Sequence, residues 1–224
     1  MNPVLNQLLT TRTVTLPDGQ RLPLDSNIES LEGDILAAWI AARQPTRILE
    51  IGLAYGVSAL FICDAIQALP GVNYYVVDPY QSSKWHGSGV RHLAEAGYEG
   101  VFTFVEEPSE ICLPAMMTKG YSFDFAFIDG QHTFDHALID FFYINRMLEI
   151  GGAVIFDDAH LPSIQKLAAH IATYPCYTPL ALPLGFENHR TIRLRRMLAA
   201  PLTRLIGFEK IADDDRSWNW HCDF

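Results

Sequence analysis

The strongest constraint on the fold is an alternation of short apolar, β-rich runs with longer helical patterns between residues 28 and 172. The runs are apolar on both faces, which indicates strands of a parallel sheet that helices cover on both sides. Right-handed crossovers then give a Rossmann-like, doubly wound α/β sheet. The expected strands are 47–52, 73–78, 101–105, 123–129 and 152–158. The expected helices are one that Asn27 caps, followed by 57–69, 89–97, 108–118, 133–149 and 161–172.

After residue 172 the pattern changes. The runs 177–184 and 190–197 flank a short loop that contains Gly185 and Asn188. This arrangement predicts an antiparallel hairpin at the edge of a mostly parallel sheet, which sets the chain apart from nicotinamide-binding Rossmann domains. A length of 224 residues fits a single domain over 1–224. We expect a helical lead-in over 1–45, a core over 46–197 and a tail over 198–224.

Composition narrows the class of partner. The chain is 49% hydrophobic and 19% charged, which is typical of a globular protein. Its net charge of −10, without a stripe of Lys and Arg, favours a small-molecule partner over nucleic acid. No signal-peptide pattern and no apolar run of about 18 residues is present, so we expect no membrane association and a cytoplasmic location. The four scattered cysteines predict buried thiols rather than a redox or metal framework: Cys63, Cys112, Cys176 and Cys222.

The turn after the first core strand carries the first functional signal. Its sequence, from Glu50 to Ser58, has the pattern ExGxxxGxS, in which Gly52 and Gly56 allow a tight bend and close approach to a ligand. The helix that follows offers free N–H groups to a carboxylate or phosphate. A dinucleotide site would instead have GxGxxG, and Ala54 stands at its second glycine. Asp78, at the end of the next strand, is placed to accept hydrogen bonds from a ribose.

A second signal comes from carboxylates at the ends of the fourth and fifth strands. Asp129, Asp157 and Asp158 are distant in sequence, but the carboxyl ends of neighbouring strands face one crevice. Crowded carboxylates repel one another unless a cation lies between them, and oxygen ligands favour Mg²⁺, Ca²⁺ or Mn²⁺. We therefore predict a divalent metal, preferably Mg²⁺, at these three residues.

His132 lies three residues after Asp129 and is the candidate general base, because a histidine with a pKa of about 6.5 accepts a proton at neutral pH. His132 and His136 also form an HxxxH pair. The glutamate of a zinc-protease helix is missing, since Thr133 takes its place, so we interpret His136 as a surface or supporting residue.

These motifs resemble those of the class I S-adenosylmethionine (SAM)-dependent O-methyltransferases. The nearest branch is related to macrolide sugar O-methyltransferases and cephalosporin-hydroxylase-like proteins. The resemblance runs from about Asn27 to Asp158. ILEIGLAYGVSAL is similar to the first motif of the family and VVDPY to the second, and FIDGQHTFDHALIDF followed by GGAVIFDDAH resembles its acidic metal-binding motifs. Related catechol-type enzymes carry a lysine where this chain has His132, which argues against a simple catechol substrate.

The resemblance implies SAM as cofactor and methyl transfer to a hydroxyl of a small molecule, such as a sugar, a phenolic or another metabolite. It implies Asp129, Asp157 and Asp158 as metal ligands, and an adenine-contacting loop within 106–114. The implied cofactor-binding residues are Glu50, Gly52, Ala54, Tyr55, Gly56, Ser58, Asp78, Pro79, Glu107, Pro108, Ser109 and Asp129. A homodimer is expected only by analogy with the family.

Several alternatives stay open. Segment 81–92, with Trp85 and His86, is either a substrate-contacting lid or an ordinary connecting loop. The chain is alternatively an NAD(P)-dependent oxidoreductase, although neither GxGxxG nor a hydride-site pair is present. It is alternatively a catalytically silent SAM-binding protein, or a methyltransferase that needs no metal.

Overall fold

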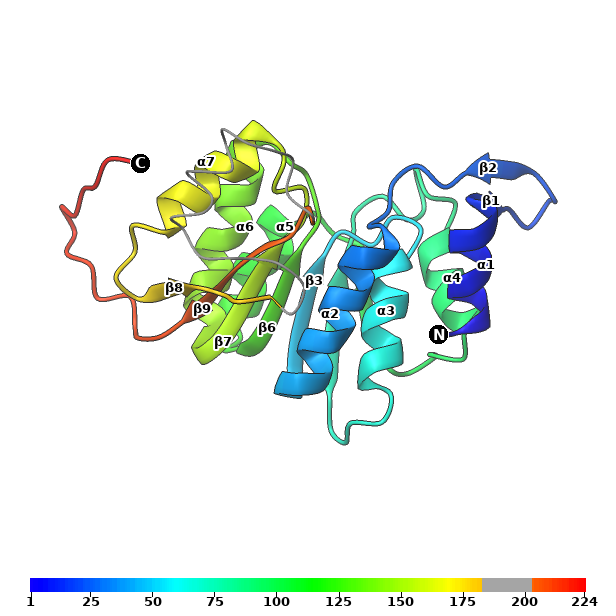
Figure 1. The fold of residues 1–224 in the computed structure, drawn as a ribbon, viewed down its shortest axis with the longest axis horizontal. Coiled ribbons are helices and arrows are strands. Elements are labelled where there is room, and N and C mark those ends of the chain that lie inside the picture. Colours follow the sequence, from blue (N-terminus) through cyan, green and yellow to red (C-terminus); the bar gives the residue numbers. More distant parts are fainter. Residues whose placement is uncertain (183–202) are drawn as a thin grey trace. The chain divides into compact units, whose positions relative to one another are not determined.

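The computed structural model describes residues 1–182 and 203–224 of the chain (Figure 1), which form two compact units. The first unit is Met1–Ser109 and the second is Glu110–Phe224. The elements of the first unit are α1 (Pro3–Thr11), β1 (Thr13–Thr15), β2 (Arg21–Pro23), α2 (Ser30–Arg43), β3 (Arg47–Ile51), α3 (Val57–Ile66), β4 (Asn73–Val77), α4 (Ser88–Glu95) and β5 (Thr103–Val105). Those that follow are α5 (Ser109–Thr118), β6 (Phe123–Ile128), α6 (Phe134–Met147), β7 (Leu148–Phe156), α7 (Pro162–Ile171), β8 (Tyr177–Pro179) and β9 (Ile206–Lys210).

In the first unit, β4 pairs in parallel with both β3 and β5. Ile48, Leu49 and Val76 are fully buried, as the two-sided apolar pattern predicts. The register sets Ile51 opposite Val77, and the N–H of Gly52 donates to the Val77 carbonyl at 2.8 Å. The chain therefore leaves β3 and β4 at the same edge of the sheet, which brings the glycine-rich turn next to Asp78.

In the second unit, β6 and β7 are parallel, with Ile128 opposite Phe156. The N–H of Asp157 donates to the Ile128 carbonyl at 3.0 Å, so the residues that follow β6 and β7 are neighbours. On its other side β7 pairs antiparallel with β9, which in turn pairs antiparallel with β8. The predicted mixture of parallel strands with an antiparallel edge is therefore confirmed. The partner of β8 is β9, from the predicted tail, whereas the run 190–197 lies outside the described residues.

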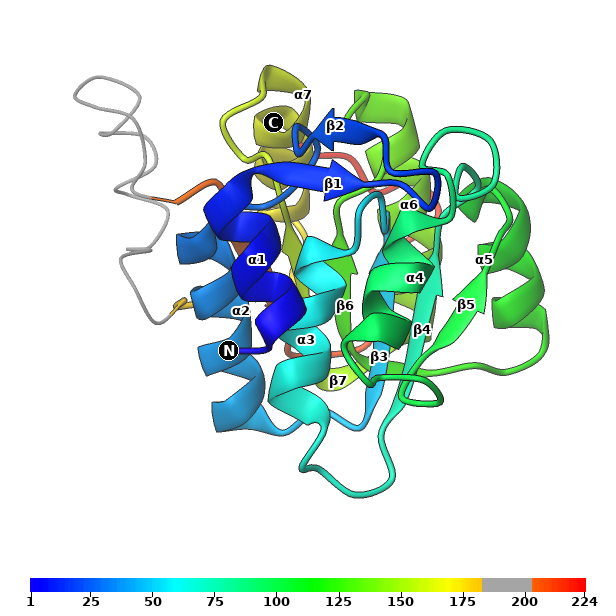
Figure 2. The same ribbon diagram turned by 90° about the vertical axis from the view of Figure 1, so that its right-hand side faces the viewer.

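The N-terminal segment contains a hairpin that the sequence analysis did not anticipate. β1 and β2 pair antiparallel across a turn at Asp18 and Gly19, and Gly19 has a φ of 87°. Figure 2 shows this hairpin in continuity with α1, which runs alongside α3. The cap predicted for the next helix is wrong by two residues, because α2 has Glu29 at its N-cap while the Asn27 amide donates to the Ile28 carbonyl.

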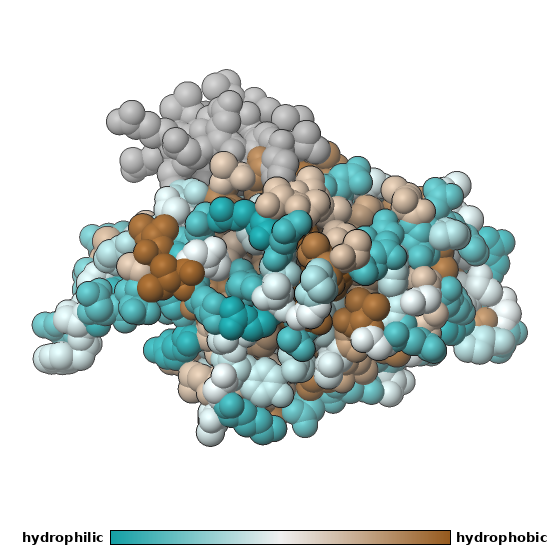
Figure 3. Space-filling model, turned by 90° about the horizontal axis from the view of Figure 1, so that it is seen from below, coloured by the Kyte–Doolittle hydropathy of each residue, from teal (hydrophilic) through white to brown (hydrophobic). Residues whose placement is uncertain are grey.

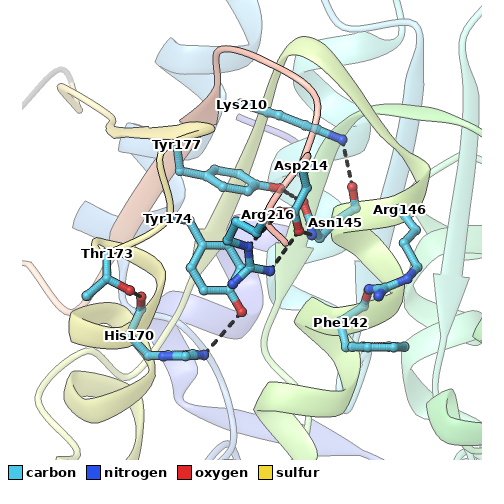
Figure 4. A network of polar contacts seen from close by, with 10 residues as sticks. All are labelled: Phe142, Asn145, Arg146, His170, Thr173, Tyr174, Tyr177, Lys210, Asp214 and Arg216. Atoms are coloured by element: carbon cyan, nitrogen blue, oxygen red, sulfur yellow. Dashed lines mark hydrogen bonds and ion pairs between the residues drawn. The ribbon is translucent and has the colours of Figure 1, made fainter. Parts of the chain in front are cut away.

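A polar network ties the C-terminal segment to α6 (Figure 4). The Asn145 side chain accepts from the Tyr177 hydroxyl at 2.9 Å and donates to Asp214 at 2.7 Å. Arg216 donates two hydrogen bonds to Asp214, and its guanidinium lies 3.2 Å from the centre of the Tyr174 ring. Residues 210–216 are therefore part of the folded unit rather than a loose end.

The buried Lys210 completes this network. Its ammonium group donates to the carbonyls of Asn145 and Leu148, at 2.7 and 2.8 Å. These carbonyls lie at the C-terminal end of α6, where carbonyl groups lack helical partners. Burial lowers the pKa of Lys210. A cation at this helix end is also favoured by the helix dipole.

The surface of the described part carries no large apolar feature on the face drawn in Figure 3, where apolar side chains form small groups between hydrophilic ones. Trp218 is the most exposed of the large apolar residues described, at 96%. Among the described residues, no helix combines the length and apolar character needed to cross a bilayer. Cys63, Cys112 and Cys176 are buried free thiols, as predicted, whereas Cys222 is exposed.

Candidate active site

The turn that follows β3 is sharply bent, as its glycines predict. Gly52 and Gly56 have φ values of 96° and 84°, in the left-handed region that favours glycine. Ala54 also adopts a left-handed conformation, with a φ of 45°, which is unusual for a residue with a Cβ. Helix α3 begins directly after Gly56. The turn thus presents backbone next to a helix N-terminus, an arrangement suited to binding an anionic group.

Asp78 holds this turn in place through hydrogen bonds to its backbone. One carboxylate oxygen accepts from the N–H groups of Leu53 and Ala54, at 3.0 and 2.8 Å, and the other accepts from the N–H of Tyr80 at 2.7 Å. The side chain is only 3% exposed. These hydrogen bonds give the carboxylate a role in positioning the turn. The predicted hydrogen bonds from a ribose to Asp78 stay a prediction.

Glu50 is also turned into the protein. It is fully buried, and its carboxylate accepts short hydrogen bonds from the hydroxyls of Ser58 and Tyr74. Burial raises the pKa of Glu50 to about 7, although the hydrogen bonds from Ser58 and Tyr74 oppose this rise. This placement differs from the cofactor contact predicted for Glu50 and Ser58, because both support the turn from the interior. Tyr74 was not among the predicted residues.

Segment 81–92 packs against the glycine-rich turn. Trp85 is buried and meets the Tyr55 ring edge-on at 5.1 Å between centroids, and Lys84 lies 4.2 Å from the centre of the Trp85 ring. The second half of the segment forms the start of α4. Of the two interpretations of segment 81–92, a substrate-contacting lid or a connecting loop, this packing favours the connecting loop.

The predicted adenine loop follows β5. Glu107 and Pro108 are exposed and Ser109 is half-buried, at the start of α5. Pro79, also predicted to touch the cofactor, is half-buried after β4. The neighbouring Glu106 accepts from the backbone N–H and the hydroxyl of Ser82, at 2.6 and 2.9 Å. This link between the loops that follow β4 and β5 was not predicted from the sequence.

The second unit brings together His132 and two of the predicted carboxylates. The Nε2 atom of His132 lies 3.2 Å from Asp158 and 3.7 Å from Asp129. His160 and Arg204 also face Asp158, at 3.5 and 3.8 Å. Neither was predicted, although His160 lies within the quoted motif. The His132 carbonyl accepts from the Ser163 hydroxyl at 2.5 Å, which ties the residue to the start of α7.

Burial of His132 favours its neutral form. Burial lowers the pKa of His132 from its ordinary value of 6.5, His160 lowers it further, and Asp158 opposes both. Since Nε2 faces Asp158, the neutral ring that carries its proton on Nε2 keeps the lone pair of Nδ1 for another proton. His136, by contrast, contacts Thr133 and Asp135 at the start of α6, at 3.0 and 3.8 Å.

The predicted metal ligands do not gather around a common point. Among the described residues, no group of three or more His, Cys, Asp or Glu side chains is arranged to hold a metal ion. Asp157 is buried after β7, while Asp158 adopts a φ of 52° and faces His132, His160 and Arg204. The Arg204 guanidinium and two imidazoles therefore surround Asp158, where a metal ion was expected.

Comparisons with known proteins agree with this fold. Residues 49–159 match a family model described as a methyltransferase domain. The chain is 28% identical over 94 residues to an uncharacterised protein of Acanthamoeba polyphaga mimivirus, a match that covers 38% of each chain. The chain therefore spans well under half the length of that curated relative.

Solved structures of similar fold extend over nearly the whole chain. A putative O-methyltransferase from Klebsiella pneumoniae is 18% identical with a TM-score of 0.67, and covers 95% of this chain and 91% of its own. An O-methyltransferase from Bacillus cereus, in complex with S-adenosylhomocysteine (SAH), is 16% identical with a TM-score of 0.70, and covers 94% and 92%. The O-methyltransferase TomG from Streptomyces achromogenes, in complex with SAM, is 18% identical with a TM-score of 0.68, and covers 95% and 91%. The family model thus indicates a methyltransferase domain at residues 49–159, and the chain has the fold of these O-methyltransferase structures.

Proposed function

We propose that this methyltransferase transfers a methyl group from SAM to a hydroxyl of a small molecule, with His132 as the general base. The observation that carries the proposal is the pairing of His132 with Asp158 at 3.2 Å, at the end of strands that lead into one cluster. The O-methyltransferase titles of the structural neighbours support oxygen as the acceptor atom. A sugar, a phenolic or another hydroxylated metabolite fits this chemistry.

When bound, SAM supplies an electrophilic methyl group, so the protein has to position the acceptor and take up its proton. In the proposed reaction Nδ1 of His132 would accept the hydroxyl proton as the oxygen attacks the methyl carbon, with SAH leaving as the sulfur–carbon bond breaks. Asp158 accepts the hydrogen bond from Nε2 and stabilises the positive charge that the ring acquires. Asp129, at 3.7 Å from Nε2, adds to this stabilisation.

The glycine-rich turn is the proposed site for the methionine part of SAM, with Gly52, Ala54, Tyr55 and Gly56 as contacts. Glu107, Pro108 and Ser109 are the proposed contacts of the adenine. Glu50, Ser58 and Asp78 are assigned to holding the turn, in keeping with their hydrogen bonds. That this turn and the cluster around His132 share one crevice stays a prediction of the sequence, as do the small-molecule partner and the homodimer.

The predicted magnesium ion is not needed for this proposal. The cluster already contains one guanidinium and two imidazoles that face Asp158. A divalent ion bound to that carboxylate would experience repulsion from the Arg204 guanidinium. Metal dependence therefore stays a prediction of the sequence, and turnover measured before and after chelation decides it.

A matched pair of variants tests the proposal. SAH binding is first measured by titration calorimetry, with NAD and NADP as the competing ligands of the oxidoreductase alternative. Turnover is then followed with labelled SAM and a panel of phenols, sugars and sugar nucleotides. His132→Asn should lower kcat by about 10²–10⁴-fold with SAH affinity unchanged, because only the proton acceptor is lost. His136→Asn, four residues further along, is the control and should retain activity. Equal turnover of His132→Asn and the unmodified enzyme would contradict the assignment of the base.

A further inference from the structure

We propose that Gln81, Gly89 and His92 are positioning residues that hold the glycine-rich turn in its bent, ligand-ready form. All three belong to the segment that follows β4 and runs into α4. The inference rests on the proposed function in one respect, namely that residues 52–56 bind SAM. It assigns to the segment after β4 a role that neither its sequence nor the family match suggests.

Gln81 links the turn to α4 through both ends of its side-chain amide. The side chain is 2% exposed. Its Nε2 donates to the Ala54 carbonyl at 2.7 Å, and its Oε1 accepts from the N–H of Gly89 at 3.2 Å. The backbone carbonyl of Gln81 also accepts from the N–H of Gly87 at 2.7 Å. A single buried side chain therefore fixes the turn against the start of the helix.

Ala54 is the residue that most needs this support. Its left-handed φ of 45° is unfavourable for a residue with a side chain. Its N–H is bound by Asp78 and its carbonyl by Gln81, so the peptide groups on both sides of Ala54 are fixed in direction. Without one of these two bonds, relaxation of φ towards an ordinary value would rotate the backbone that is proposed to meet the cofactor.

Gly89 allows α4 to touch the turn. A Cβ at this position would lie 2.6 Å from the Ala54 carbonyl oxygen and 2.8 Å from Cγ of Leu53. On the turn, a Cβ at Gly56 would lie 3.0 Å from the Gly89 carbonyl oxygen. Gly89 lies inside a helix and does not have a positive φ, so alanine would otherwise be the more favourable residue there. Close contact with the turn is the feature that requires glycine.

His92 makes the third link, one turn further along α4. Its Nδ1 lies 2.8 Å from the Tyr55 carbonyl oxygen, and the side chain is buried. Burial lowers the pKa of His92, so the neutral ring donates from Nδ1–H to that carbonyl. Two successive carbonyls of the turn, those of Ala54 and Tyr55, are thus bound by side chains of one segment. A turn that is fixed in advance spares the ordering cost that a mobile loop incurs on binding.

Two glycine variants provide the sharpest test. Gly89→Ala forces the Ala54 carbonyl to move, whereas Gly33→Ala makes the same change inside α2, where the nearest atoms belong to the Phe61 ring, at 2.2 Å. Both variants should lower the melting temperature. Only Gly89→Ala should weaken SAH binding, by about tenfold or more, the change in an equilibrium constant that corresponds to one buried hydrogen bond. Equal SAH dissociation constants for Gly89→Ala and Gly33→Ala would overturn the proposal.

A third variant separates this inference from the proposed function. Gln81→Met keeps the size of the side chain but removes its hydrogen bonds to Ala54 and Gly89. In the absence of ligand, the amides of Leu53 and Ala54 should exchange with solvent about tenfold faster than in the unmodified protein, because the turn opens more often. Unchanged exchange would refute the positioning role even if SAH binds. Conversely, if the unmodified protein does not bind SAH but exchange accelerates, the proposed function fails and the positioning role stands.

Discussion

Replacing Glu50 by glutamine should remove a pH dependence of stability that this single carboxyl introduces. Its pKa is raised from 4.5 to about 7, chiefly by burial. Between these two values the folded protein holds a proton that the unfolded chain has released. The free energy of unfolding therefore falls as the pH rises from about 4.5 to about 7, and it levels off above that range.

The size of the effect follows from the two pKa values. The difference between 4.5 and about 7 corresponds to about 3 kcal/mol in total. About 2.5 kcal/mol of this should be lost between pH 5 and pH 8. In Glu50→Gln, the side-chain amide can accept from one of the two hydroxyls of Ser58 and Tyr74 and donate to the other, so the buried contacts are kept without a charge.

Urea unfolding at pH 5, 6, 7 and 8 measures this effect. The variant and the unmodified protein share every other titrating group, so the difference between their free energies of unfolding isolates Glu50. That difference should shift in favour of the variant by about 2.5 kcal/mol from pH 5 to pH 8. Tyr74→Phe is a useful comparison, because loss of a hydrogen bond to the carboxylate should raise the pKa of Glu50 further. Parallel curves for Glu50→Gln and the unmodified protein would refute the reasoning.

Three further outcomes are expected. The rate of methyl transfer should fall as the pH drops below the lowered pKa of His132, which lies under 6.5. Profiles of kcat against pH should show this fall in the unmodified enzyme but not in His132→Asn. Chelation with EDTA should leave turnover unchanged, because the Arg204 guanidinium lies 3.8 Å from Asp158 and would repel a cation there; loss of activity that Mg²⁺ restores would show that the ion is required. Lys210→Met should lower the free energy of unfolding by about 2 kcal/mol, because two carbonyls at the end of α6 lose their donor. In urea unfolding this loss should be larger than that of Tyr177→Phe, at about 1 kcal/mol. The reverse order would contradict the capping role of Lys210.

The order of strands and helices could be predicted from the sequence because a strand that is buried on both sides appears as an uninterrupted apolar run. Runs such as RILEI and FDFAFI contain few polar residues, and these two strands each end one residue earlier than predicted. The hairpin of β1 and β2 was missed because each strand has only three residues. The Asp18-Gly19 pair was the signal that could have indicated it.

The positions of the candidate residues along the chain were predictable, but the directions of their side chains were not. A strand pattern shows that Glu50 is interior, yet it does not show that Tyr74 lies diagonally across on the neighbouring strand. That follows only from the register, in which Ile48 faces Tyr74 and Glu50 faces Val76. Similarly, Asp78 was correctly placed beside the turn, but its choice between a ribose and backbone N–H groups depends on the exact path of the bend.

The contacts of the cluster around His132 were also only partly predictable, because its residues are far apart in the sequence. Asp129 and Asp158 follow neighbouring strands, so their proximity to His132 was predictable from topology. Arg204 comes from the chain just before β9, and no local pattern connects it with Asp158. The expectation of a metal ion relied on counting negative charges, and it did not include the positive charge of Arg204 beside Asp158.

The pairing of β9 with β7 sets a practical limit on how this protein can be shortened. A fragment confined to residues 49–159 would contain the stretch matched by the family model but would lack the neighbour that covers one side of β7. The bare strand would then present an apolar sequence, GGAVIF, with unsatisfied backbone groups to other molecules. Such a fragment should aggregate when expressed alone, so the boundaries of a recombinant version have to be chosen by strand pairing instead of by sequence similarity.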